Sequence, residues 1–136
     1  RGKLVGLENY LGMIRKAGLI PGLACHNGER LRMVDKGGYD VGVFVTPVNK
    51  CGFYMNPTQR SILNAISRTK RPVIAIKPLG SGRFDEGRVR EWLEWSLGQS
   101  GVSALCLGFM SEEEAEEDIT CMKQILGMRG SRKGSG

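Results

Sequence analysis

Two short segments indicate the fold of this chain: DVGVFVTP (residues 40–47) and VIAIKP (residues 73–78). Each is a nearly continuous run of apolar, largely β-branched residues, which is typical of strands buried on both faces of a parallel sheet. Between them, Pro57 at a first helical position and apolar residues at helical spacing predict a helix over residues 57–69. The three segments together predict one β-α-β unit.

The same patterns continue on both sides of this unit. Apolar runs at residues 19–25 and 103–109 predict two further strands. Apolar residues at helical spacing, with glycines or polar residues at the ends, predict four further helices, over residues 7–17, 27–38, 86–98 and 111–126. The order is therefore one leading helix followed by four strand–helix units, which is the order of a parallel α/β fold.

Two architectures use this order: an open doubly wound sheet and the (β/α)8 barrel, which has about 250 residues. The segment after the first strand, CHNGER, lacks the G-x-G-x-x-G pattern of doubly wound dinucleotide-binding folds. We therefore predict a parallel (β/α)4 half-barrel of TIM-barrel type over residues 1–128, followed by a flexible basic Gly/Ser tail at residues 129–136. The outer strands of a half-barrel have open edges, so we expect them to be covered by a missing barrel half, by a second copy, or through an altered topology.

Composition excludes several classes of partner. The 136 residues include 20 basic and 14 acidic side chains, but three of the basic ones lie in the terminal tail and six acids cluster at residues 112–118. No single basic face results, so we expect no nucleic-acid partner. No apolar run is long enough to span a membrane and no signal-peptide pattern opens the chain, so we expect a cytoplasmic protein without a membrane partner.

The cysteines and the only histidine give little indication of a metal. The four cysteines show no C-x-x-C spacing, which favours reduced thiols. Cys25, His26 and Cys51 fall at the same end of the predicted sheet, but no helical or hairpin spacing holds them together as ligands. We expect no bound metal.

Chemistry in parallel α/β folds lies where the strands end, and here the third and fourth strands end in anion-binding features. The loop Gly80-Ser81-Gly82 can turn backbone N–H groups toward one anion, with Lys77 and Arg83 to neutralise it. At the end of the fourth strand, Ser111 begins a helix whose N-terminus favours negative charge, and Glu114 completes a capping box. These features predict a nucleotide or a phosphorylated small molecule as ligand. The alternative is that the glycines make a tight turn, Lys77 pairs with an acid and Ser111 only caps its helix.

His26 follows the first strand, where a general acid or base is useful, and it is the only histidine of the chain. With Lys77, it is the candidate catalytic group. The alternative is a hydrogen-bonded histidine at the rim of the sheet.

Two segments, PVIAIKPLGSGR (72–83) and EWLEWSLGQSGVSALCLGFMSEEEAEEDI (91–119), resemble the C-terminal part of aldo-keto reductases. Members of that family have a Pro-Leu-Gly turn, an Ala/Trp-rich helix, a Gly-Val-Ser/Thr step into the last strand and a Gly-x-x-Ser-x-x-x-x-Glu pattern. The resemblance covers about the last third of the chain well.

The resemblance implies a NAD(P)-binding, aldo-keto-reductase-like oxidoreductase of which this chain is the C-terminal, cofactor-binding half. It implies that Leu79, Gly80, Ser81 and Gly82 face the cofactor pyrophosphate, that Ser111 faces the adenosine phosphate, and that Glu117 and Asp118 face the adenine. Met110 stands where the family has a basic residue for the NADP 2′-phosphate. The family's catalytic residues come from the first half of its barrel, which this chain does not contain.

Two alternative functions stay open at this point. One is a non-catalytic half-barrel that self-associates through its open sheet edges into a dimer. The other is a fragment of a TIM-barrel isomerase or lyase that acts on a phosphorylated substrate through His26 and Lys77.

Overall fold

Four parallel strands form one sheet in the computed structural model, which describes residues 4–83 and 87–131. The strands lie side by side in sequence order: β1 (Gly22–Ala24), β2 (Val43–Pro47), β3 (Val73–Ile76) and β4 (Ala104–Cys106). The predicted parallel α/β class is confirmed. Each strand is shorter than the sequence predicts, because a ladder of hydrogen bonds exists only where a neighbouring strand runs alongside.

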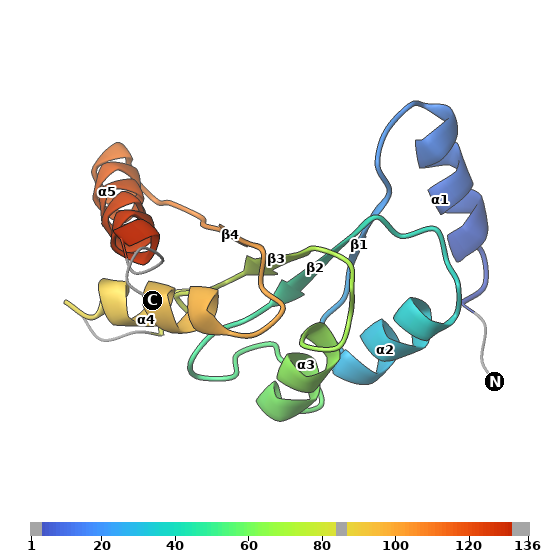
Figure 1. Ribbon diagram of the computed structural model, residues 1–136, viewed down its shortest axis with the longest axis horizontal. Helices are drawn as coiled ribbons and strands as arrows, with labels where there is room; N and C mark the ends of the chain where they lie inside the picture. The colour runs from blue at the N-terminus through green and yellow to red at the C-terminus, as the bar shows by residue number, and fades with distance from the viewer. Residues whose placement is uncertain (1–3, 84–86, 132–136) are drawn as a thin grey trace.

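In the described part of the chain, five helices accompany the sheet: α1 (Leu7–Lys16), α2 (Gly28–Lys36), α3 (Gln59–Ile66), α4 (Val89–Gly98) and α5 (Glu112–Ser131). Helices α2, α3 and α4 lie on one face of the sheet, whereas α1 and α5 stand at its two ends (Figure 1). No helix of the described residues is long and apolar enough to cross a membrane.

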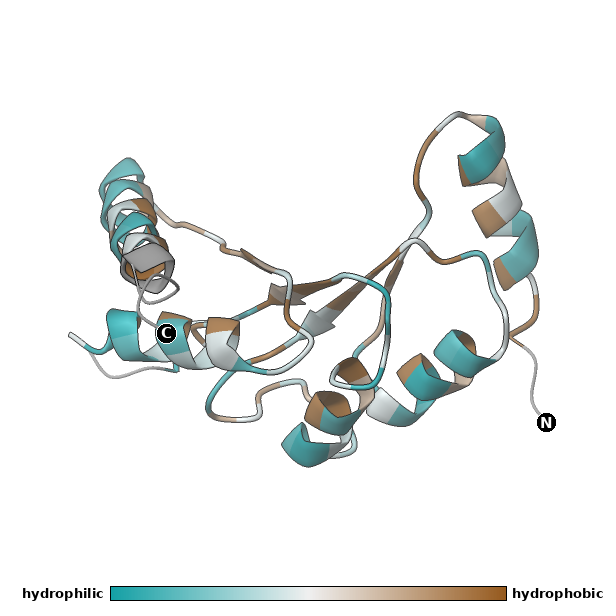
Figure 2. Ribbon diagram, in the orientation of Figure 1, coloured by the Kyte–Doolittle hydropathy of each residue, from teal (hydrophilic) through white to brown (hydrophobic). Residues whose placement is uncertain are grey.

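The hydrophobic core lies between the sheet and the helices on its covered face. Phe44, Val73 and Ala75 are fully buried and pack in one cluster with Leu31 of α2 and Ile62 of α3. A second cluster joins Leu79, Trp92, Leu93 and Ile125, and so attaches α5 to α4. Figure 2 shows the hydrophobic sides of α2 and α3 turned toward the strands.

The other face of the sheet is apolar but uncovered. The register places Ala24 beside Val45, Val45 beside Ile74, and Ile74 beside Ala104, so these four side chains form a row across the sheet. Ala24 and Ala104 are exposed, and Val45 and Ile74 are half-buried. We call this uncovered face the inner face of the sheet. The prediction that the strands are buried on both faces is wrong for this chain, because no described residue covers the inner face.

Helix boundaries follow capping interactions more closely than proline and glycine signals. Thr58, not Pro57, begins α3: its hydroxyl accepts a hydrogen bond from the Ser61 N–H at 3.1 Å. Helix α5 continues past Gly127 to Ser131, although the sequence predicts an end at Gly127. A glycine in a helix costs only about 1 kcal/mol relative to alanine, so it does not by itself end a helix. Three residues of the predicted tail are thus helical, and residues 132–136 lie outside the described residues.

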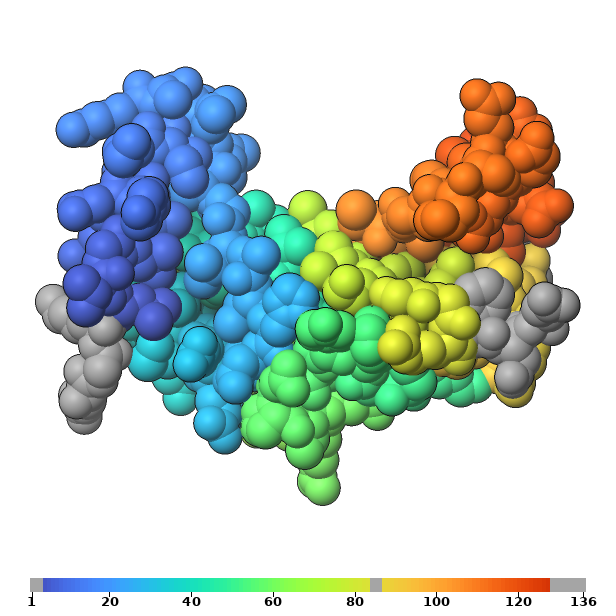
Figure 3. Space-filling model, turned by 180° about the vertical axis from the view of Figure 1, so that it is seen from behind, coloured from blue at the N-terminus to red at the C-terminus, as the bar shows by residue number. Residues whose placement is uncertain are grey.

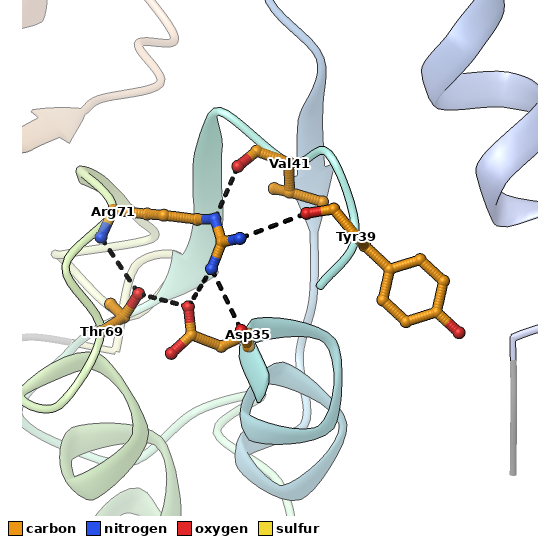
Figure 4. A network of polar contacts seen from close by, with 5 residues as sticks. All are labelled: Asp35, Tyr39, Val41, Thr69 and Arg71. Atoms are coloured by element: carbon orange, nitrogen blue, oxygen red, sulfur yellow. Dashed lines mark hydrogen bonds and ion pairs between the residues drawn. The ribbon is translucent and has the colours of Figure 1, made fainter. Parts of the chain in front are cut away.

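A polar network joins the end of α2 to the starts of β2 and β3 (Figure 4). The Arg71 guanidinium donates to the backbone carbonyls of Val41 at 2.7 Å and Tyr39 at 3.2 Å, and it forms an ion pair with Asp35. Thr69 donates to the Asp35 carboxylate at 2.8 Å and accepts from the Arg71 N–H. The network lies at the amino ends of the strands, away from the edge where the candidate site lies, so its role is structural.

Candidate functional site

A hollow of about 580 Å³ lies where β3 and β4 end. It is lined by residues 76–79, 81–82 and 106–110 and by Glu114. Four of the predicted site residues therefore meet there: Lys77, Leu79, Ser81 and Gly82. Most of the remaining lining is apolar, and Lys77 is the only basic side chain among the lining residues that the structure describes.

The loop after β3 has an unusual backbone conformation. Gly80, Ser81 and Gly82 all have left-handed φ angles, at 60°, 56° and 80°. A Cβ at Gly80 would lie 3.0 Å from the Cys51 Sγ and 3.1 Å from Trp92, so a side chain at this left-handed position would be both crowded and strained. The backbone N–H groups of Ser81 and Gly82 donate to no group of the described residues. The loop is therefore a tight turn that also leaves two amide donors available beside the hollow.

Lys77 has a left-handed backbone (φ 55°), and its ammonium group lies 5.3 Å from the centre of the Tyr54 ring. No carboxylate in the described part of the chain forms an ion pair with it. The charge of Lys77 is thus available to an anionic ligand.

Arg83 lies outside the lining of the hollow. Its guanidinium stacks on the Phe53 ring at 3.6 Å and donates to the backbone carbonyls of Gly80 at 3.2 Å and Ser81 at 3.4 Å. These contacts hold the turn against the loop that follows β2, so Arg83 supports the conformation of the turn rather than facing the hollow.

The start of α5 forms the Ser111 half of the predicted capping box, whereas the Glu114 carboxylate reaches one residue further back than predicted, to Met110. The Ser111 hydroxyl accepts from the Glu114 N–H at 3.2 Å, and the Glu114 carboxylate accepts from the Met110 N–H at 2.6 Å. Hydrogen bonds from its own backbone N–H and from Ser111 lower the pKa of the Glu113 carboxyl. Two carboxylates of the chain therefore already occupy the N-terminus of α5. Their negative charge disfavours the adenosine phosphate that the family resemblance implies at Ser111.

Glu117 and Asp118 do not line the hollow. Glu117 is exposed and lines a separate, shallow depression of about 420 Å³ on α5. Asp118 is only 4% exposed, and its Oδ2 has no hydrogen-bond partner among the described residues. Burial raises the pKa of the Asp118 carboxyl, and the nearby charges of Glu114 and Glu117 raise it further.

His26 lies beside a second hollow, of about 510 Å³, at the end of β1. Its imidazole meets the Tyr54 ring edge-on, with the ring centres 5.8 Å apart. Because Lys77 contacts the same ring, Tyr54 lies between the two predicted catalytic residues. Tyr54 thus joins one lining residue of the first hollow, Lys77, to one lining residue of the second, His26.

Sequence reasoning missed Tyr54 and Phe53. Both lie in the loop after β2, which the buried Asn49 holds: its side chain accepts from the Phe53 N–H at 2.7 Å and donates to the Phe53 carbonyl at 2.9 Å. The sequence feature that could have identified them is a pair of aromatic residues directly after Gly52, in a loop at the carboxyl end of a predicted strand.

Within the described ranges, no group of three His, Cys, Asp or Glu side chains is arranged to hold a metal ion. All four cysteines are free thiols. Comparisons of the chain with models of protein families, with curated proteins and with solved structures found no match.

Proposed function

We propose that this chain is the cofactor-binding half of an aldo-keto-reductase-like oxidoreductase, folded as half of a TIM barrel. Three observations support the half-barrel: the four parallel strands are adjacent in sequence order, helices cover one face, and the opposite face is apolar and open. A closed barrel has this strand order and an apolar interior.

The observation that carries the binding proposal is the composition of the hollow at β3 and β4. Lys77 supplies one unpaired positive charge, and Ser81 and Gly82 supply two free amide donors beside it. This donor set fits one phosphate or pyrophosphate group. The apolar lining, which includes Leu79 and Phe109, fits an aromatic base.

The carboxylates at the start of α5 indicate which dinucleotide fits. Glu114 lines the hollow and can accept hydrogen bonds from the hydroxyl groups of a ribose. The same carboxylate, with Glu112 and Glu113 beside it, repels a 2′-phosphate. The hollow therefore fits NAD better than NADP.

A bound nicotinamide would supply hydride transfer, and this chain would supply binding and orientation. Lys77 and the amides of residues 81–82 hold the pyrophosphate, and Arg83 keeps the turn in place from outside. Lys77 in the hollow, Tyr54 in contact with it, and His26 on the far side of Tyr54 are side chains that can hold or pass a proton near the bound cofactor. The family's catalytic residues lie in its first barrel half, so we expect this chain by itself to bind the dinucleotide without turnover.

The test is ligand binding by calorimetry and thermal shift with NADH, NADPH and inorganic phosphate. NADH at about 100 times its dissociation constant is expected to stabilise the fold by about 2.7 kcal/mol. Lys77→Gln is expected to weaken NADH binding roughly tenfold or more, since a hydrogen bond to a charged group contributes about 1.5–3 kcal/mol. Lys36→Gln, an exposed change at the end of α2, is the matched control. Absence of NADH binding to the unmodified chain would refute the proposed function.

A further inference from the structure

Most exposed large hydrophobic residues of the described chain lie on the two segments that flank the open side of the sheet, the side of its inner face (Figure 3). Ten large hydrophobic residues among those described are exposed, and all except Tyr54 lie within residues 5–20 or 109–126, on or beside α1 and α5. In the space-filling view these two segments rise at either side of the sheet and bound a wide concavity between them (Figure 3). The inner face of the sheet, with Val45 and Ile74 at its centre, forms the apolar floor of this side.

The helices at the two ends carry half-covered apolar stripes. On α1, Leu11 is buried, but Tyr10 and Met13 are 67% and 66% exposed. On α5, Ile125 is buried against α4, but Ile119 and Leu126 are 44% and 53% exposed. Apolar patches of this extent on a folded chain mark interaction surfaces.

Both edges of the sheet are open as well. Within the described residues, β1 pairs only with β2 and β4 pairs only with β3. A partner that covers the open side must therefore offer two parallel strand edges at once, one for β1 and one for β4.

Charge distinguishes the two edges. Where β1 ends, His26 and Arg30 line the second hollow, and neither forms an ion pair with a carboxylate of the described chain. Where β4 ends, the first two turns of α5 carry six acids, at residues 112–114 and 116–118, and no base. The β1 edge thus carries Arg30, which has no ion pair within the described residues and lies next to Glu29, whereas the β4 edge is strongly anionic, at the same end of the sheet.

We propose that a second copy of this chain covers the open side, with β4 of each copy beside β1 of the other. A two-fold axis along the strand direction makes both seams at once and keeps all strands parallel. It brings the acids of one α5 to His26 and Arg30 of the other copy at each seam. It also places the exposed stripe of α1 next to that of the other copy's α5. The dimer has eight strands, the number at which side chains fill the interior of a parallel barrel.

The inference does not depend on the proposed cofactor. The mass in solution is measured by light scattering after gel filtration, and the expected value is twice the 14.9 kDa of the chain. Ile74→Glu, which puts a charge on the inner face, is expected to give a monomer with an unchanged far-UV circular dichroism spectrum. Asn64→Glu, on the exposed side of α3, is the matched control and is expected to stay dimeric.

Charge reversal tests the pairing of the two edges. Arg30→Glu is expected to raise the dimer dissociation constant at least tenfold. Adding Glu112→Lys and Glu116→Lys to the Arg30→Glu variant is expected to return the dissociation constant to that of the unmodified chain. A mass of 14.9 kDa at every concentration, which would indicate a different occupant of the open side, overturns the inference. So does a dimer that is insensitive to Ile74→Glu, or a charge reversal that shows neither loss nor rescue.

Discussion

The ammonium group of Lys77 lies 5.3 Å from the centre of the Tyr54 ring, and both residues have left-handed backbone, with φ of 55° and 59°. For a residue with a Cβ this conformation costs roughly 1–2 kcal/mol. Strain of this kind persists where the surrounding structure enforces it and often lies at functional sites. The pair joins the loops after β2 and β3 beside the hollow proposed to bind the dinucleotide.

Comparison of Lys77→Gly with Lys77→Ala isolates this strain. Both variants lose the charge, so both are expected to weaken NADH binding to the same extent. Glycine adopts φ near 55° without the Cβ clash, so Lys77→Gly is expected to be about 1 kcal/mol more stable than Lys77→Ala. Urea unfolding measures the difference in stability. Equal stability of the two variants would show that the left-handed conformation costs nothing.

Asp118 is expected to lower the stability of the fold at neutral pH. Its carboxyl is buried, Oδ2 lacks a partner, and its pKa is raised in the folded state. The folded state therefore binds this proton more tightly than the unfolded state, and stability falls as pH rises through the folded pKa. Asp118→Asn is expected to remove this loss and to gain about 1 kcal/mol at pH 7. Unfolding of both proteins from pH 4 to 8 should show the difference in stability widening as pH rises and levelling off above the folded-state pKa of Asp118. NADH affinity should not change because Asp118 does not line the hollow.

Two glycine substitutions are expected to act in opposite directions. A Cβ at Gly28 would lie 2.4 Å from the Ser61 carbonyl oxygen, where α2 meets α3, so Gly28→Ala is expected to destabilise the fold by about 1–3 kcal/mol. Gly12 in α1 has nothing within 4 Å of its Cβ position, and Gly12→Ala is expected to stabilise the fold by about 1 kcal/mol. Thermal unfolding compares both with the unmodified chain. A neutral Gly28→Ala would contradict the close approach of the two helices.

The Arg71 network is expected to contribute to stability and not to binding. Arg71 is half-buried, and its removal leaves the carbonyls of Val41 and Tyr39 without their side-chain donor and the Asp35 carboxylate without its cationic partner, with only the Thr69 hydroxyl still donating to it. Arg71→Met is expected to cost about 2–3 kcal/mol. The Arg15–Asp40 pair is exposed, so Asp40→Asn is expected to leave denaturant midpoints unchanged within error. A change in NADH affinity of folded Arg71→Met would contradict a purely structural role.

The side chain at position 110 is expected to influence whether NADH or NADPH binds more tightly. It lines the hollow and is 95% exposed, so a basic side chain fits there without loss of packing. Met110→Arg is expected to shift the ratio of NADPH to NADH affinity toward NADPH by roughly tenfold, because it pairs with the 2′-phosphate and offsets the acids that follow. Met110→Gln is the uncharged control. An unchanged ratio in Met110→Arg would place the adenosine end of the cofactor elsewhere.

Local sequence patterns determined much of this protein. The order of helices and strands, the parallel class and the Ser111 half of the capping box all follow from neighbours within one or two turns of the chain. Such interactions are present in the sequence before any tertiary contact forms, so periodicity and caps predict them. The place of Lys77 and of the glycine loop after β3 at the candidate site follows likewise from the rule that ligands bind where parallel strands end.

Packing between distant segments sets which residues meet across the sheet and which apolar surfaces stay open. Tyr54 contacts both His26 and Lys77 because Asn49 folds the loop after β2 between them. Arg83 stacks on Phe53 instead of facing the hollow, and α5 turns Asp118 inward while Ile119 stays exposed. These outcomes depend on packing between segments distant in sequence, and on the absence of a cover over the inner face in the described chain. A local pattern specifies that a stripe is apolar, but the arrangement of the neighbouring elements decides whether anything covers it.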